Sequence, residues 1–184
     1  MQTARKSYSK IDGTAPSHFA FWPVAKQHEA IGYPEDAFMI EVTDRASLKT
    51  KGLFSCHAVA IGGLRDDGMA ALYLSHNLAE YWRSTIVHLG TVLTFMWDAG
   101  YVPTFAASMG PSDRALEGRG FAAMSKFEGI ASVAIGECVA EAGIEQQVFM
   151  YDEPTAKNSI VLRYVPDVVP KFTVACANAV LATA

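Results

Sequence analysis

The sequence predicts an α+β fold in a single domain over residues 1–184, with a mixed or antiparallel β-sheet flanked by two or more helices. The length of 184 residues suits one domain. Hydrophobic residues make up 51% of the chain and charged residues 18%, which provides material for a core and argues against disorder. Several strand-like segments surround two helical ones, and this arrangement is typical of α+β domains.

Three strands are predicted in the first half of the chain. They follow a lead-in of residues 1–36, which is rich in Gly, Pro, Ser and His and is expected to be irregular. Residues 37–42 form a short apolar segment that precedes turn-forming residues. Residues 53–61 and 69–75 are also apolar, and the glycine clusters within 62–68 permit a turn between them. We therefore expect an antiparallel hairpin here.

A long amphipathic helix is predicted next. Asn77 is a candidate N-cap, with Glu80 three residues later as in a capping box. Apolar residues then recur at spacings of three and four, which is typical of one buried helix face. They are Leu78, Trp82, Ile86, Leu89, Leu93 and Met96. Gly100 is placed to end the helix.

The second half of the chain gives further elements. Residues 101–107 predict a weak strand that leads into a polar loop at 108–121, which we expect to be mobile and to serve as a docking surface. A second helix is predicted at 130–142, where it ends at a glycine. Two strands, 146–151 and 159–165, follow and are joined by a turn that contains Pro and Asn.

The composition argues against several classes of function. Fifteen Lys and Arg residues against nineteen Asp and Glu residues give a net charge of −4. This charge does not predict the basic surface with which proteins usually bind nucleic acid. The most apolar helical segment, 78–97, carries Glu80, Arg83 and His88, so membrane insertion is not expected. The N-terminus has basic residues but no apolar run behind them, unlike a Sec signal peptide. We expect a cytoplasmic protein, or an effector secreted without such a signal.

The three cysteines, Cys56, Cys138 and Cys176, are too few and too scattered for a disulfide framework or a structural zinc site. Cys138 in the second helix and Cys176 in an apolar tail are interpreted as packing thiols. Cys56 lies near the start of one hairpin strand, and the partner strand ends near His76. Because hairpin strands are antiparallel, this thiol and imidazole can meet across the ladder. Cys and His form the minimal pair for nucleophilic acyl transfer.

The most distinctive motif runs from Thr50 to Cys56 and reads TKGLFSC. With the apolar strand after it, this motif resembles the T-x-G-L-G-S-C-V-A-V signature of the CheD family of chemotaxis-receptor glutamine deamidases. Further along, GMAALYLSH is similar to the family's strand that carries the histidine. SVAIGECVAEAGIEQQVFMYDE and NSIVLRYVPD are similar to its helix and closing strands. The CheD family shares its fold and active site with the catalytic domain of cytotoxic necrotizing factor and with Burkholderia lethal factor.

The resemblance implies a cysteine amidohydrolase that deamidates a glutamine side chain of a partner protein, as a bacterial toxin or effector or as an endogenous regulator. In such an enzyme Cys56 is the nucleophile, His76 is the base, and Thr50 holds the imidazole. Ser55 and Phe54 are the two residues before the nucleophile, and they are expected to contact the substrate or the oxyanion. Phe54 stands where the family has glycine. This chemistry requires no metal or organic cofactor.

Two alternatives stand beside this function. One is a non-catalytic binding or regulatory domain on the same fold, with Cys56 merely buried. The other is a cysteine protease or a transglutaminase-like acyltransferase with the same dyad.

Other residues are weaker candidates for the site. His57 is the rival base, but neighbours in a strand point to opposite faces, so it should face away from the thiol. His18 and His28 could hold a metal, although a solvated lead-in is more common. The acidic pair at residues 152–153 is interpreted as solvated.

Overall fold

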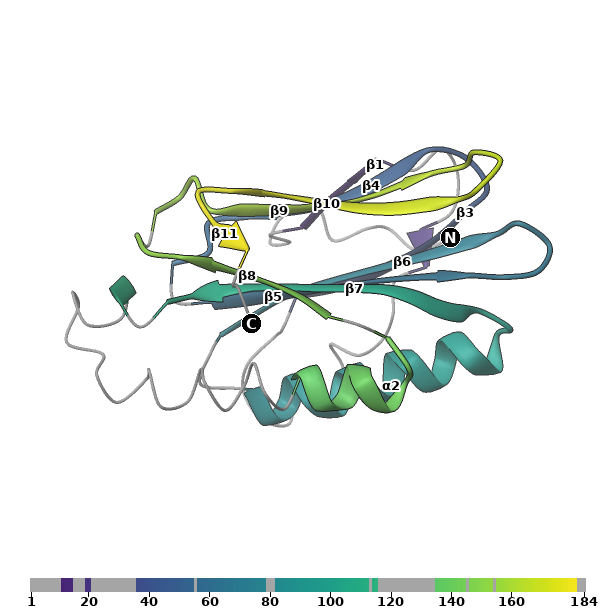
Figure 1. The fold of residues 1–184 in the computed structure, drawn as a ribbon, viewed down its shortest axis with the longest axis horizontal. Coiled ribbons are helices and arrows are strands. Elements are labelled where there is room, and N and C mark those ends of the chain that lie inside the picture. Colours follow the sequence, from purple (N-terminus) through teal and green to yellow (C-terminus); the bar gives the residue numbers. More distant parts are fainter. Residues whose placement is uncertain are drawn as a thin grey trace.

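The computed structural model describes residues 11–14, 19–20, 36–54, 56–78, 82–112, 114–115, 135–144, 146–153 and 155–181. Within these residues the chain forms three layers: a smaller sheet, a larger sheet, and helices on the outer face of the larger sheet (Figure 1). This architecture confirms the predicted α+β class in one compact domain. The strands divide between two sheets that face each other, and the gap between the sheets is filled by apolar side chains.

The larger sheet has seven strands. They are β2 (Phe19–Ala20), β3 (Asp36–Val42), β5 (Cys56–Leu64), β6 (Ala70–Leu78), β7 (Val102–Pro111), β8 (Gln146–Tyr151) and β11 (Val180–Leu181). Their order is β11-β8-β7-β5-β6-β3-β2. The β7 and β8 strands run parallel and the other neighbours antiparallel, so the sheet is mixed as predicted.

The smaller sheet has four antiparallel strands in the order β1-β4-β9-β10. They are β1 (Ile11–Thr14), β4 (Ala46–Lys51), β9 (Ser159–Val165) and β10 (Lys171–Ala177). Among them, only β9 was predicted from the sequence. Residues 1–36 were predicted to be irregular throughout, whereas β1 and β2 lie inside that lead-in. Both β1 and β2 are short, and each forms by pairing with a strand farther along the chain, β4 and β3 respectively. No local sequence pattern identifies such a partner, so these two strands could not be predicted.

The β5–β6 hairpin has a shorter turn than predicted. The backbone N–H of Arg65 donates to the carbonyl of Met69 at 2.8 Å, so the turn lies here and not across residues 62–68. Gly62 is inside β5, where a Cβ atom would lie 2.5 Å from the ring of Phe172. The glycine therefore permits a close approach between the two sheets rather than a turn.

The same hairpin extends farther than predicted at its open end. Pairing continues to Cys56 opposite Leu78, which places His76 and Asn77 within β6. The prediction that Asn77 caps the helix is therefore wrong. Asn77 is buried opposite His57, because continued pairing with β5 outweighs the local capping preference of Asn.

Helices cover the outer face of the larger sheet (Figure 1). The α2 helix spans Trp82–Asp98 and is the amphipathic helix that the sequence predicted. It ends at Gly100, which has a left-handed φ of 81° and whose N–H donates back to the last turn. Residues 135–141 are also helical, within the predicted second helix at 130–142, and Gly143 follows with a φ of 74°.

The docking loop predicted at residues 108–121 begins instead as part of a strand. Residues 108–111 belong to β7, and Ser108 and Met109 are buried. They pair with β8 on one side, and the first two also pair with β5 on the other, which removes them from the surface. Residues 113 and 116–121 of the predicted loop lie outside the described residues.

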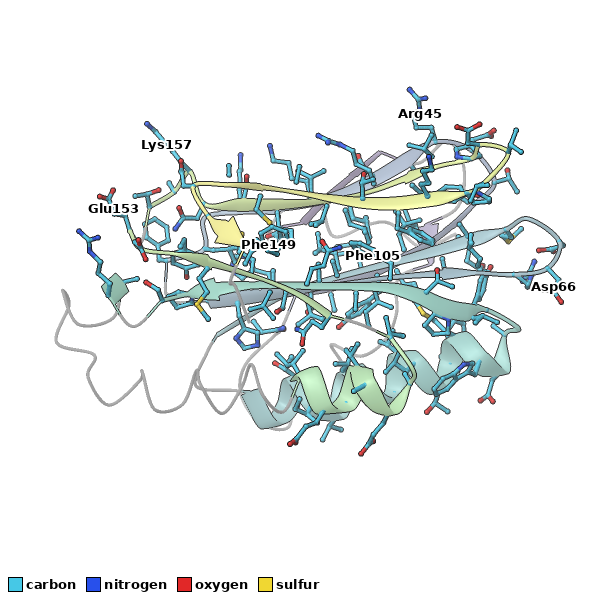
Figure 2. The ribbon with its side chains drawn as sticks, in the orientation of Figure 1. Arg45, Asp66, Phe105, Phe149, Glu153 and Lys157 are labelled. Carbon is cyan, nitrogen blue, oxygen red and sulfur yellow. The ribbon has the colours of Figure 1, made fainter. Side chains whose placement is uncertain are left out.

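Two apolar cores form on the two faces of the larger sheet. One lies between this sheet and the helices. The other lies between the two sheets, where Phe105 and Phe149 point (Figure 2). Cys56 belongs to the core between the sheets, together with Leu48 from the smaller sheet and Leu72 from the larger one. The candidate nucleophile therefore lies at the interface of two layers.

Candidate functional site

Thr50 comes to the site from the smaller sheet. It follows Ala46 and Leu48 on the buried face of β4, and the residues between them are more exposed. Gly52, just after the strand, has a left-handed φ of 74°, a conformation that favours glycine, and its N–H donates to the carbonyl of Asn158 at 2.9 Å. The TKGLFSC motif is thus the connection that carries the chain from one sheet to the other.

His76 lies in β6, an interior strand, opposite Asp36 of β3 and Ala58 of β5. Its Nδ1 atom lies 2.7 Å from Oγ1 of Thr50, in a buried hydrogen bond that joins the two sheets. The structure therefore brings together the predicted base and the predicted threonine. His76 had been expected at the end of its strand, but two further residues of β6 follow it and fix its backbone in the ladder.

Cys56 is the first residue of β5 and lies opposite Leu78. Because Ala58 shares a face with Cys56 and pairs with His76, the thiol and the imidazole are diagonal neighbours on the face between the sheets. Such positions are about 7–8 Å apart or less, within reach of long side chains. Ala58 places only a methyl group beside them. Thr50 is 0% exposed, and Cys56 and His76 are each 4% exposed.

His57 occupies the other face of β5. Its Nε2 atom lies 3.3 Å from Oγ1 of Thr85, a buried residue of α2 on the helix side of the sheet. Strand alternation predicts this orientation, and His57 is thereby separated from Cys56 by the sheet itself.

Two residues that were not predicted from the sequence hold the backbone around Cys56. Tyr151 Oη donates to the carbonyl of Cys56 at 2.9 Å. Asn158 Nδ2 donates to the carbonyl of Leu53 at 2.9 Å and to that of Glu153 at 2.7 Å. Both side chains are fully buried. Asn158 stands in a turn, where Asn is common, so its sequence context carries no signal of this second role.

The segment before the nucleophile alternates between core and surface. Leu53 is fully buried, whereas Phe54 is 42% exposed. The Phe54 ring lies close to Gly52, where a Cβ atom would be 3.8 Å from its Cε2. An aromatic side chain thus stands on the solvent side of the segment that leads to Cys56. Ser55, the other predicted residue on the substrate side, lies outside the described residues.

The remaining candidates do not join this site. Asp152 is exposed and accepts a hydrogen bond from Ser112 Oγ at 2.6 Å, and Glu153 is also exposed, in agreement with a solvated acidic pair. His18 and His28 lie outside the described residues. Within the residues that the structure does describe, no group of three His, Cys, Asp or Glu side chains could hold a metal ion.

Comparison with known proteins finds no match. No protein-family model matches the chain, and neither a curated protein nor a solved structure does. In the described part of the chain, no helix combines the length and the apolar character needed to cross a membrane. Function is therefore inferred from the geometry of Thr50, Cys56 and His76.

The three thiols are expected to differ in reactivity. Burial raises the pKa of the Cys176 thiol to about 12. Burial, with Glu141 nearby, also raises the pKa of Cys138. A raised thiol pKa leaves less thiolate at a given pH, whereas an imidazole that pairs with a thiol has the opposite effect. Cys56 is the most buried of the three. We nevertheless expect iodoacetamide at about pH 6.5 to modify Cys56 much faster than the other two, because the thiolate is the reactive form and an ordinary thiol is only about one-hundredth ionised there.

Peptide mapping by mass spectrometry measures the three rates in one sample, so that Cys138 and Cys176 serve as internal controls. Equally slow modification of all three thiols would show that Cys56 is not activated by His76.

Proposed function

We propose that the protein is a cysteine-dependent glutamine deamidase that converts a side-chain amide of a partner protein to a carboxylate. The observation that carries this proposal is the buried 2.7 Å hydrogen bond between Thr50 Oγ1 and His76 Nδ1, with Cys56 one diagonal step away on the same face. A thiol beside an imidazole that a third group orients is the arrangement of an activated cysteine nucleophile. The TKGLFSC motif, which resembles that of the CheD deamidases, supplies two of these three residues.

In the proposed reaction His76 Nδ1–H donates to Thr50 Oγ1, which leaves the lone pair of Nε2 for the thiol. Cys56 gives its proton to Nε2, and the thiolate attacks the carboxamide carbon of the substrate Gln. The imidazolium then protonates the departing ammonia, which leaves a thioester on Cys56. A water molecule that His76 deprotonates hydrolyses the thioester, so that Glu is released and the thiol is restored. Backbone N–H groups at the start of β5 stabilise the oxyanion, with a contribution of about 3–4 kcal/mol per donor in well-studied enzymes.

The burial of the site favours a deamidase over a protease or a transglutaminase. All three side chains are nearly inaccessible, so an extended substrate backbone cannot lie along them while the two sheets stay packed. A protease must admit that backbone, and a transglutaminase must also admit a second amine substrate. A side-chain deamidase needs only a narrow opening for one Gln side chain and leaves the substrate backbone outside. We therefore assign the reaction to a side-chain amide.

The reaction is tested by incubating a soluble cell extract with the wild-type protein or with Cys56→Ser. We expect a gain of about one mass unit at a specific Gln of a partner protein, from replacement of NH₂ by OH, without cleavage of the chain. Peptide mapping identifies the site, and Cys56→Ser is a matched control because it differs by one atom. Cleavage of the partner protein's chain, without the gain of one mass unit, would indicate a protease and not a deamidase.

A non-catalytic binding or regulatory domain is the second candidate, and the burial of Cys56 is the observation that favours it. In such a domain Cys56 acts only as a small apolar side chain of the core. The two candidates differ in the alkylation experiment, because only the deamidase requires a Cys56 that reacts faster than Cys138 and Cys176. They also differ in the extract experiment, where a non-catalytic domain produces no change of mass at any Gln.

A further inference from the structure

Tyr151 donates to the backbone of Cys56 a hydrogen bond that β7 cannot supply. The antiparallel register between β5 and β7 ends at Ala58 opposite Met109. If it continued by two residues, Pro111 would lie opposite Cys56. Proline has no backbone N–H, so this position of β7 cannot donate a ladder hydrogen bond to the Cys56 carbonyl. The two strands thus lose their pairing at the residue that carries the thiol.

The phenol of Tyr151 takes the place of the missing donor. Tyr151 lies in β8, on the far side of β7 from β5, and pairs with Pro111 in parallel register. Its side chain is fully buried, and its Oη donates to the Cys56 carbonyl at 2.9 Å. The backbone of Tyr151 is held in turn, because its own carbonyl accepts the N–H of Ser112 at 2.9 Å. The donor is therefore anchored on a strand and not on a loop.

The connection between β8 and β9 holds the other side of the same segment. Asn158 donates to the carbonyl of Leu53, three residues before Cys56. Figure 2 labels Glu153 and Lys157, which lie on this connection, at the end of the molecule opposite the hairpin turn at Asp66. The backbone around Cys56 is thus held on both sides, by the last residue of β8 and by Asn158 in the connection that follows it.

We propose that Tyr151 is a positioning residue for Cys56. By fixing the carbonyl of Cys56 where β5 separates from β7, its hydroxyl sets the direction in which the thiol leaves the backbone. The thiol is thereby held on the diagonal toward His76. This inference rests on the proposed Cys–His pair, but it concerns the thiol itself and is measured without any substrate.

The test compares Tyr151→Phe with Tyr164→Phe. Each variant removes one hydroxyl from the core between the sheets, and Tyr164 is an equally buried residue whose ring packs on Phe172 with 5.3 Å between centroids. Iodoacetamide modification of Cys56 is followed from about pH 3 to pH 9, a range that spans the lowered pKa values of paired thiols, about 3.5–7.5, and the ordinary value of about 8.5. For Tyr151→Phe we expect a rate constant at pH 6.5 that is about three- to tenfold lower, as loss of one neutral hydrogen bond would give. Its pH profile should also move toward that of an ordinary thiol.

We expect Tyr164→Phe to match the wild type in both rate and pH profile, and thermal melting shows that both variants are folded. Equal Cys56 profiles in the wild type and Tyr151→Phe overturn the positioning role, whether or not the wild type deamidates. An equal shift in both variants also overturns it, since any lost hydroxyl would then act alike. A shift confined to Tyr151→Phe supports the role even where the extract experiment finds no deamidated Gln, and in that case only the proposed function fails.

Discussion

Replacing His76 with Ala is expected to lower glutamine deamidation about a thousandfold or more. A positioned acid–base group alone contributes about 10²–10⁴-fold, and a nucleophile that loses its base loses most of its reactivity. The loss should appear in the rate of chemistry, because in the proposed mechanism the imidazole activates Cys56 and protonates ammonia without holding the substrate. Ammonia release and intact mass are measured on the partner protein that the extract experiment identifies. Circular dichroism shows that the variant is folded.

His57→Ala is the matched control for this experiment. His57 is also a buried histidine of the same hairpin, but it faces Thr85 on the helix side of the sheet. We expect this variant to keep most of the activity. An inactive His57→Ala beside an active His76→Ala would reverse the assignment and would require a β-bulge at Cys56 that turns the thiol to the other face.

Thr50→Ala completes the series. In the proposed mechanism Thr50 orients the imidazole and does not touch the substrate carbonyl, so its loss should slow the reaction without removing it. The order of activity that we expect is wild type, then Thr50→Ala, then His76→Ala.

Replacing Asn158 with Ala is expected to lower the free energy of unfolding by about 2–4 kcal/mol. The side chain is fully buried and donates to the carbonyls of Leu53 and Glu153. Alanine leaves both acceptors without this donor, and a buried group that loses its hydrogen bond costs about 1–3 kcal/mol. Urea denaturation followed by tryptophan fluorescence measures the change.

Thr155→Ala separates this effect from a general weakening of the turn. Thr155 Oγ1 donates to Asn158 Oδ1 at 3.2 Å, and the residue is only partly buried. We therefore expect a loss below about 1 kcal/mol, since a partly solvated hydrogen bond can be replaced by water. Similar losses in the two variants would mean that Asn158 does not hold the segment before Cys56.

The sequence predicted best the elements with a strong pattern of their own. The apolar runs that became β3, β8 and β9 were located almost to the residue, and the spacing of apolar residues located α2. The hairpin that became β5 and β6 was predicted with the correct partners, but its first strand was predicted at 53–61 and lies at Cys56–Leu64, and its second strand was predicted to end early, at Ser75. The extension of the second strand to Leu78 could not be predicted, because pairing with β5 outweighs the local preferences of His76 and Asn77.

The division of the strands between two sheets was not predicted. The strand that carries Thr50 does show a signal, since Ala46, Leu48 and Thr50 alternate with more polar residues. Such alternation shows that one face is buried but not which sheet covers it. The motif placed Thr50 six residues before Cys56, yet only the fold shows that these six residues cross between layers. The supporting roles of Tyr151 and Asn158 depend on contacts across about a hundred residues, for which a single sequence offers no pattern.

The hydrogen bond between Thr50 and His76 has a consequence for the order of events during folding. Thr50 belongs to the smaller sheet and His76 to the larger one, so their contact exists only after the two layers have docked. A newly made chain in which the larger sheet has formed alone has an imidazole that Thr50 does not yet orient. In the proposed deamidase, full nucleophilic power would thus arrive last, together with the completed core. A half-folded molecule would carry a weaker nucleophile with which to attack its neighbours.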